Sequence, residues 1–308
     1  MRSFVATVVA ATFSCLLFGS LLRTAEAQGI VTGTVECQGE LQKLPNGLLG
    51  CSQPTHVRHL GKGGPGSGNP NDYGMCGILS INMNVAEDLT WKDDVQIVVN
   101  SAGEYEIQVG INNTSVGLKP PVAQYTCVYF HAFKGVPPIS DGVGLTPAPF
   151  SAGTSGGSAP ISASPAYACI WAGFEGDLAA SPKPGSVAVA EGEAGAQLFK
   201  PETRFSAQSA TSYAFCSGYT APSWLWHYLN NSGVSIDTPT NLGINKKDYW
   251  CYMDLIQDDI VDFGPVYTVI AQINISSTGD YSLGGIFHKM VTGENSVSMG
   301  YNCLPLTQ

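Results

Sequence analysis

The sequence predicts an all-β protein made of two tandem antiparallel β-sandwich domains that disulfides stabilise. Three observations predict this fold: a hydrophobic pattern with a period of two, a segment that occurs twice, and eight cysteines beyond the N-terminal apolar run. Charged residues make up only 12% of the 308 residues, against about 25% in typical soluble proteins. The 44% of hydrophobic residues are enough to form a core, so disorder is excluded.

The repeated segment is the main argument for two domains. Residues 95–107, VQIVVNSAGEYEI, align without a gap with residues 271–283, AQINISSTGDYSL, at an offset of 176. The offset continues downstream, where Cys127 matches Cys303. We interpret the match as an internal duplication, and the alternative is one β-hairpin pattern that arose twice.

Each copy has the pattern of a β-hairpin. In the first copy, Ile97 and Val99 share one face before a glycine-containing turn, and Tyr105 and Ile107 share one face after it. This alternation makes one face of a sheet apolar. A slip of one residue would turn every core side chain to solvent, so the constant offset predicts the same strand register in both copies.

The hairpin also carries a family resemblance. The pattern I-x-V-x-x-A-G-x-Y-x-I at residues 97–107 resembles the hairpin of jelly-roll modules in the C1q and TNF-like group. The pattern G-E-Y-x-I within it resembles the F strand of immunoglobulin-like domains. Both resemblances imply an antiparallel sandwich, jelly-roll-like or immunoglobulin-like, and neither assigns a functional residue.

The first 27 residues have the organisation of a signal peptide. Arg2 is followed by an apolar run from residue 4 to residue 22, and Ala25 and Ala27 take the −3 and −1 positions of a cleavage site. The alternative is an uncleaved anchor, because a membrane-spanning helix needs about 20 apolar residues. We expect cleavage and a secreted or extracellular protein, periplasmic or at the cell surface in a bacterium. No membrane span is expected afterwards.

The remaining chain divides by composition. We assign residues 28–133 to the first β-sandwich and residues 166–308 to the second, with four cysteines in each. Residues 134–165 between them are dense in Gly, Pro, Ser and Ala and have no periodicity, which is typical of a linker.

The eight cysteines predict four disulfides, because an even number in an exported chain is normally fully paired. The repeat indicates equivalent bridges in the two copies, each joining the strand that enters the repeated segment to the strand that leaves it. The predicted pairs are Cys76–Cys127, Cys251–Cys303, Cys37–Cys51 and Cys169–Cys216.

Charge and aromatic residues narrow the class of ligand. The formal net charge of −10 repels phosphate backbones, which excludes nucleic acid as a partner. Trp224, Trp226 and Tyr228 would share one face of a strand, where their rings could bind a carbohydrate or a protein ligand. The alternative is that these rings fill the core. The sequence is also compatible with a homo-oligomer.

An acidic cluster is the candidate metal site. Asp254, Asp258, Asp259 and Asp262 could bind calcium, which is plentiful outside cells. The alternative is a solvated acidic turn. Apart from this calcium, no cofactor is expected.

No catalytic residue is assigned. Residues 153–157, GTSGG, satisfy G-x-S-x-G, but they lie in the linker without the strand and helix that expose a nucleophile. The first hypothesis is therefore a secreted, non-enzymatic module that is structural, adhesive or ligand-binding. The second is a secreted hydrolase that acts on an extracellular polymer such as a polysaccharide, using paired carboxylates.

Overall fold

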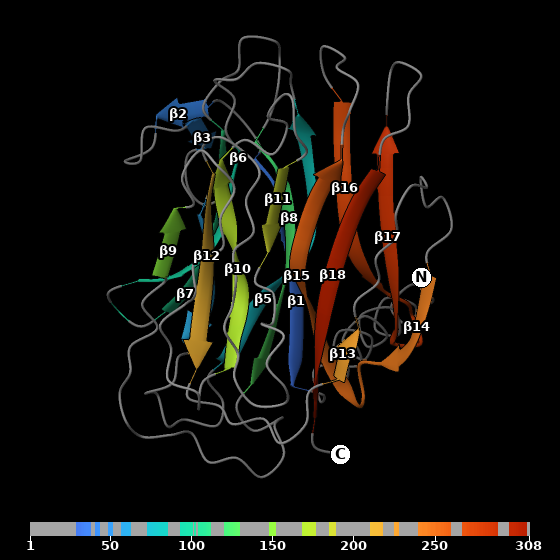
Figure 1. Ribbon diagram of the computed structural model, residues 1–308. Helices are drawn as coiled ribbons and strands as arrows, with labels where there is room; N and C mark the ends of the chain where they lie inside the picture. Colours follow the sequence, from blue (N-terminus) through green and yellow to red (C-terminus); the bar gives the residue numbers. More distant parts are fainter. Residues whose placement is uncertain are drawn as a thin grey trace, which may run out of the picture.

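In the computed structural model, the described residues form β-strands connected by turns and short irregular segments (Figure 1). The strands pair antiparallel and none of the described residues is helical, which confirms the all-β class. The predicted signal peptide lies outside the described residues. The described residues are 29–37, 41–43, 49–51, 57–62, 73–85, 93–100, 102, 104–111, 120–129, 148–151, 168–176, 185–188, 210–217, 225–227, 240–259, 267–288 and 296–306.

One sheet has six strands, in the order β1-β8-β5-β16-β17-β14, and every neighbouring pair is antiparallel. Its strands are β1 (Ile30–Val35), β5 (Tyr73–Val85), β8 (Val122–Tyr129), β14 (Thr240–Asn245), β16 (Tyr267–Ile275) and β17 (Asp280–His288). Strands from the beginning and the end of the chain are therefore hydrogen-bonded to each other.

The second sheet has eight strands, in the order β2-β3-β7-β6-β10-β12-β9, and β4 also pairs with β7. Its strands are β2 (Leu41–Lys43), β3 (Leu49–Cys51), β4 (Val57–Lys62), β6 (Asp93–Val99), β7 (Glu104–Ile111), β9 (Ala148–Ser151), β10 (Ala168–Gly176) and β12 (Ala210–Ser217). The third sheet has the order β11-β15-β18-β13. It contains β11 (Gly185–Ala188), β13 (Leu225–His227), β15 (Tyr249–Asp259) and β18 (Ser296–Pro305).

Three strand pairs, one in each sheet, carry directly opposed cysteines. We call β5 with β8 the first unit, β10 with β12 the second unit, and β15 with β18 the third unit. The opposed cysteines are Cys76 and Cys127, Cys169 and Cys216, and Cys251 and Cys303. Disulfides join the first and third of these pairs, as the repeat predicts.

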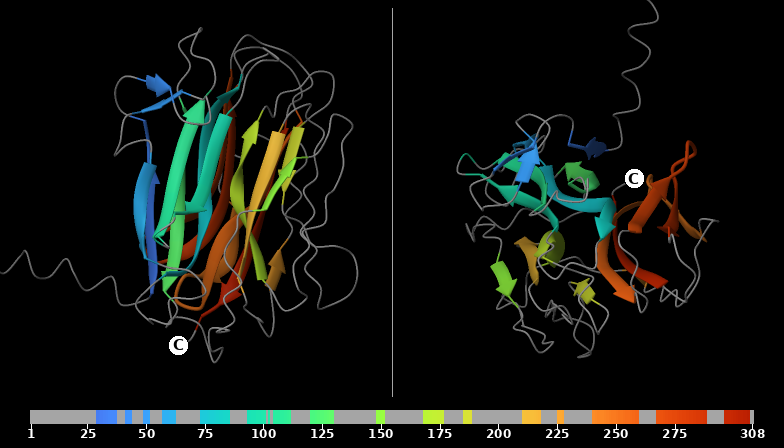
Figure 2. Two further views of the ribbon diagram at one scale, coloured as in Figure 1. Left: turned by 90° about the vertical axis from the view of Figure 1, so that its left-hand side faces the viewer. Right: turned by 90° about the horizontal axis from the view of Figure 1, so that it is seen from above.

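The three units are linked in a closed ring. The first strands of the units are β5, β10 and β15, and each is followed in the chain by β6, β11 or β16, respectively. This following strand pairs with the first strand of the next unit: β6 with β10, β11 with β15, and β16 with β5. The strands β5, β10 and β15 also contact one another in pairs. Seen from above in Figure 2, the cyan, yellow-green and orange-red strands lie on three sides of this shared interior.

From the first cysteine onward, the register inside the three units is the same. The residue three positions after the first cysteine is the extra residue of a β-bulge: Leu79, Ala172 and Asp254. Beyond the bulge, the pairs are Ser80 with Gln124, Gly173 with Tyr213, and Leu255 with Gly300. A bulge shifts the pairing by one residue and sharpens the local twist, so the three units bend at equivalent places.

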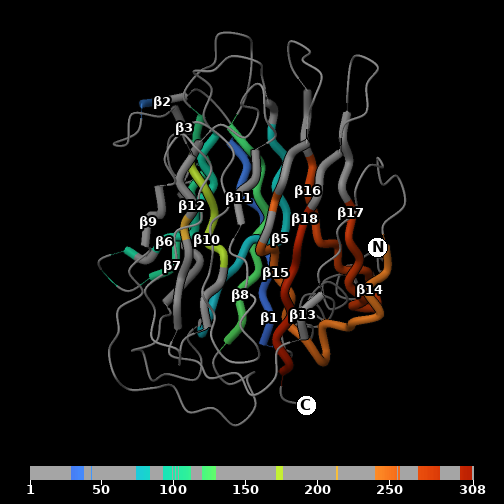
Figure 3. The backbone as a smooth tube through the Cα atoms, in the orientation of Figure 1, coloured from blue at the N-terminus to red at the C-terminus, as the bar shows by residue number. Residues whose placement is uncertain are grey.

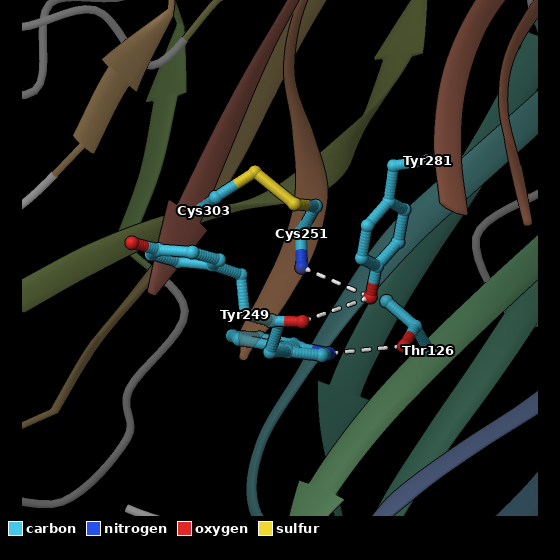
Figure 4. The surroundings of a disulfide bond; sticks show 6 residues. Thr126, Tyr249, Cys251, Tyr281 and Cys303 are labelled. Carbon is cyan, nitrogen blue, oxygen red and sulfur yellow. Dashed lines mark hydrogen bonds between the residues drawn. A yellow bond between two sulfur atoms is a disulfide. The ribbon is translucent and has the colours of Figure 1, made fainter. Parts of the chain in front are cut away.

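The two hairpins predicted from the sequence also correspond. Val99 pairs with Tyr105, and Ile275 pairs with Tyr281, at the same offset of 176. The Tyr105 hydroxyl donates to the Gly74 carbonyl at 3.2 Å, two residues before Cys76. The Tyr281 hydroxyl donates to the Tyr249 carbonyl at 3.3 Å, two residues before Cys251 (Figure 4). The register expected from the offset is present in both copies.

The core lies between the sheets. In Figure 3 the coloured tube includes parts of β5, β8, β10, β15 and β18, which supply many of its side chains. The largest fully buried side chains include Trp171, Trp250, Tyr105, Tyr252 and Tyr281. Burying a large apolar side chain contributes about 1.5–3 kcal/mol, so these aromatic residues are major sources of stability.

The sheets do not confirm the predicted division into two tandem sandwiches. Residues 28–133 and 166–308 share two sheets, because β5 pairs with β16 and β6 pairs with β10. Within residues 134–165, assigned to a linker, β9 forms a strand against β12. The hydrophobic period of a strand indicates which of its side chains face the core, but it does not indicate which other strand pairs with it. The sequence therefore suggested separate domains.

The disulfides are typical of an oxidising, extracellular compartment. Cys37 is disulfide-bonded as well, whereas the side chains of Cys51, Cys169 and Cys216 lie outside the described part. The predicted bridges Cys37–Cys51 and Cys169–Cys216 stay predictions. Among the described residues, no helix has the length and hydrophobicity to cross a membrane.

Candidate functional site

The predicted aromatic row is only partly within the described residues. Trp226 lies on β13, where its backbone pairs with Asn302. Trp224 and Tyr228 lie outside the described residues, and so does the side chain of Trp226. The ligand-binding role of these three residues stays a prediction.

The predicted calcium site stays a prediction, because the side chains of Asp258 and Asp259 lie outside the described part of the chain. Asp254 is buried at the bulge of β15, with 7% of its surface exposed. Asp258 and Asp259 lie farther along β15, opposite Val297 and Ser296, and Asp262 lies outside the described residues. No group of three or more His, Cys, Asp or Glu side chains suited to a metal occurs among the described residues.

A polar cluster lies on the eight-stranded sheet, on the face opposite the core. Val95 and Phe174 belong to the core. Side chains alternate along a strand, so their neighbours Asp94 and Glu175 point to the other face. Asp94 and Glu175 are directly opposite each other on the adjacent strands β6 and β10. This register brings together two carboxylates that are far apart in the sequence.

Three hydrogen-bond donors hold these carboxylates. The Gln96 side-chain amide donates to Asp94 Oδ1, and Gln108 Nε2 donates to Asp94 Oδ2 at 3.3 Å. The Tyr213 hydroxyl donates to Glu175 Oε2 at 3.4 Å. We call these five residues the outer network. It draws on four neighbouring strands, β7, β6, β10 and β12, so sheet pairing alone fixes its geometry.

The outer network runs from a buried end to a partly exposed end. Asp94 is fully buried and Gln96 is 5% exposed, whereas Gln108, Glu175 and Tyr213 are half-buried. Burial, and then the charges of Glu175 and Asp94, raise the pKa of Tyr213, so its hydroxyl stays protonated and can donate. The network offers carboxylate oxygens, amide groups and a phenol, which are groups that bind hydroxyls and amides of a ligand.

The carboxylate pair is present at only one of three equivalent positions in the ring. In the six-stranded sheet, the residues equivalent to Asp94 and Glu175 are Ile270 and Asn82. In the four-stranded sheet, they are Ser186 and Gln257. Because the backbone register is the same in all three sheets, the fold itself does not require two carboxylates here.

Sequence reasoning missed the outer network for a physical reason. Asp94, Gln96 and Gln108 could have been grouped, because they lie on the polar face of one predicted hairpin. Glu175 and Tyr213 join them only because β6 pairs with β10. That pairing crosses the predicted domain boundary, and no local pattern indicates it.

A second polar cluster lies inside the third unit. Burial raises the pKa of Asp254 to about 7, and a bond to its own backbone N–H opposes the shift. Burial, followed by the Asp254 charge, raises the pKa of Tyr252 and of Tyr301. Asp254 is thus close enough to both tyrosines for its charge to act on them.

Comparison with family models, with curated proteins and with solved structures finds no match for this chain.

Proposed function

We propose that this chain is an exported, non-enzymatic ligand-binding protein, and that the outer network is its binding surface. The carboxylate pair of Asp94 and Glu175 supports this most directly, because the two equivalent positions of the ring lack it. The equivalent positions hold Ile and Asn in one sheet and Ser and Gln in another, and these sheets have the same register. Two opposed carboxylates are therefore not needed for the fold, and like charges directly opposite each other are destabilising.

The proposed ligand is a neutral compound with several hydroxyl groups, such as a saccharide. Two carboxylates repel anions, which disfavours phosphorylated or acidic ligands. Carboxylate and amide side chains present donors and acceptors in one plane, and neighbouring sugar hydroxyls can bind two such atoms at once. The half-buried residues Gln108, Glu175 and Tyr213 form the accessible end where such a ligand would bind.

The hydrogen bonds within the network favour binding over catalysis. Both oxygens of Asp94 accept amide N–H groups, which stabilises the ionised carboxylate. Glu175 accepts the Tyr213 hydroxyl. A glycoside hydrolase uses one carboxyl as a proton-donating general acid, whereas both Asp94 oxygens and Glu175 Oε2 act as hydrogen-bond acceptors in the network.

A saccharide panel tests the proposal. We expect the mature protein to bind at least one neutral oligosaccharide, and Gln108→Ala or Glu175→Gln to weaken that binding at least about tenfold, the loss of one charge-assisted hydrogen bond. The matched control is Gln272→Ala, at the position of the six-stranded sheet that is equivalent to Gln96. Equal losses in the control and in the network variants would remove the site assignment.

A hydrolase is the second candidate, and one observation favours it. Directly opposed residues have Cβ atoms about 4.5–5.5 Å apart, and retaining glycosidases hold their carboxyl groups about 5 Å apart. Asp94 and Glu175 are opposed in this way. Release of reducing ends from a polysaccharide panel, abolished by Glu175→Gln, would replace the binding proposal by this one.

Export and repeat origin belong to the same proposal. We expect the N-terminal residue of the mature protein to be Gln28, as sequencing of the secreted form can test.

We also infer that the ring descends from duplication of one unit. Shared register, shared bulges and equivalent tyrosine hydrogen bonds support this descent.

A further inference from the structure

Two buried acceptor oxygens inside the third unit have no hydrogen-bond partner, Asp254 Oδ1 and Asn302 Oδ1. The hydroxyl of Tyr252 lies next to them and interacts with the Asn302 side chain. Tyr252, Asp254 and Asn302 are 0%, 7% and 3% exposed, respectively. The Asn302 oxygen is an acceptor only, and so is that of an ionised Asp254. A buried acceptor without a partner costs about 1–3 kcal/mol, so these atoms require a partner that supplies protons or positive charge.

The three residues belong to one place in the fold. Tyr252 and Asn302 are directly opposed on β15 and β18, so their side chains share the same face of the sheet. Asp254 follows two residues later at the bulge, and its charge acts on Tyr252. We call Tyr252, Asp254 and Asn302 the buried oxygen cluster.

The other two units do not have this cluster. At the bulge, Leu79 and Ala172 take the place of Asp254. Gly77 opposite Thr126, and Ile170 opposite Phe215, take the place of Tyr252 opposite Asn302. The ring therefore forms without a carboxyl at the bulge, and the third unit keeps one at a cost in stability.

We propose that the buried oxygen cluster binds one hard cation, such as calcium or sodium, through Asp254, Asn302 and Tyr252. Carboxylate, amide and hydroxyl oxygens are the ligands that such cations prefer.

This ligand set differs from the acidic cluster that the sequence suggested. It keeps Asp254 and uses neutral oxygens from a tyrosine and an asparagine in place of further carboxylates.

Thermal unfolding of the mature full-length chain tests the site. At pH 8 and constant ionic strength, we expect calcium chloride or sodium chloride to raise the Tm by about 5 °C or more over a choline chloride control. Comparing the two salts identifies the ion. The shift should disappear in Asp254→Leu, which introduces the residue of the first unit.

The matched control is Asp280→Asn, an exposed carboxylate next to the same unit, which should keep the shift. Because a variant can fail to fold, equilibrium dialysis of the unmodified protein with calcium and with sodium gives an independent readout, and about one ion per chain is expected. Equal Tm values in all three salts, with no ion retained, would overturn the proposal and assign the oxygens to buried water. Binding at the outer network is independent of either result.

Discussion

The first and third units pair in the same register, and their disulfides close loops of nearly equal length, with sequence separations of 51 and 52 residues. In each case a tyrosine from a strand outside the unit donates to the carbonyl two residues before the first disulfide cysteine, Tyr105 from β7 and Tyr281 from β17. Their interiors differ, however. Gly77 in the first unit corresponds to Tyr252 in the third, and Leu79 corresponds to Asp254.

These differences are complementary. Gly77 and Tyr252 pack directly against each other, and Gly77 leaves the space that the tyrosine ring needs. The Trp250 indole, two residues before Tyr252, donates to the Thr126 hydroxyl at 2.9 Å across the same interface. Equivalent positions on a ring meet near its axis, where three large side chains would collide. Equivalent backbone positions are therefore compatible with different side chains.

The largest expected effect tests whether the two disulfides are equivalent. Replacing both cysteines of either bridge by alanine should lower the free energy of unfolding by about 4 kcal/mol, because the loops have nearly equal length. Urea unfolding of both double variants measures this. A difference above about 2 kcal/mol between them would break the comparison between the units.

The second prediction concerns the bulge. In the folded state the pKa of Asp254 is about 7, against 3.8 for an ordinary aspartate. The unfolded chain therefore binds fewer protons than the folded chain between about pH 4 and pH 7, and stability falls as the pH rises through this range. In metal-free buffer, the loss should approach about 4 kcal/mol above pH 7.

Asp254→Leu should remove this loss and leave the free energy of unfolding nearly constant between pH 4 and pH 8. Denaturant titrations at several pH values measure it. Asp280→Asn is the control, because Asp280 is exposed and hydrogen bonds from Thr278 and Asn245 lower its pKa. A pH profile that persists in Asp254→Leu would assign the titration to another group.

The third prediction tests the packing between the two units. Gly77→Ala should destabilise the protein by about 1–3 kcal/mol, because the added methyl group would overlap the Tyr252 Cβ. Tyr252→Gly, which removes the Cβ as well as the ring, should abolish most of this penalty. A double-mutant cycle with thermal unfolding measures the coupling. No coupling would mean that the interior near Gly77 relaxes independently of Tyr252.

The smallest effect concerns the tyrosine hydrogen bonds. Tyr105→Phe and Tyr281→Phe should each cost about 1 kcal/mol, the net contribution of one buried hydrogen bond. The Tyr281 hydroxyl also accepts the Cys251 N–H at 3.4 Å, so its loss should cost slightly more (Figure 4). Urea midpoints of the two variants compare them directly.

The sequence by itself determined the local features. Period-two alternation specified β-strands, and the constant offset specified the common register of the two hairpins. The two equivalent bridges, Cys76–Cys127 and Cys251–Cys303, followed from the same alignment, in which Cys127 matches Cys303 at an offset of 176 and Cys76 matches Cys251 at an offset of 175. These features depend on residues close in the chain or on matched positions in two copies, and such information is readable in one dimension.

Only the tertiary structure decided which strands lie side by side. The pairings of β6 with β10, β11 with β15 and β16 with β5 created the ring, and the first of them created the outer network. The bulge that buries Asp254 is likewise visible only in the pairing of β15 with β18. Backbone hydrogen bonds between strands form in the same way whatever the side chains are. Which strands pair is therefore decided by the packing of the whole core, and no short sequence pattern indicates it.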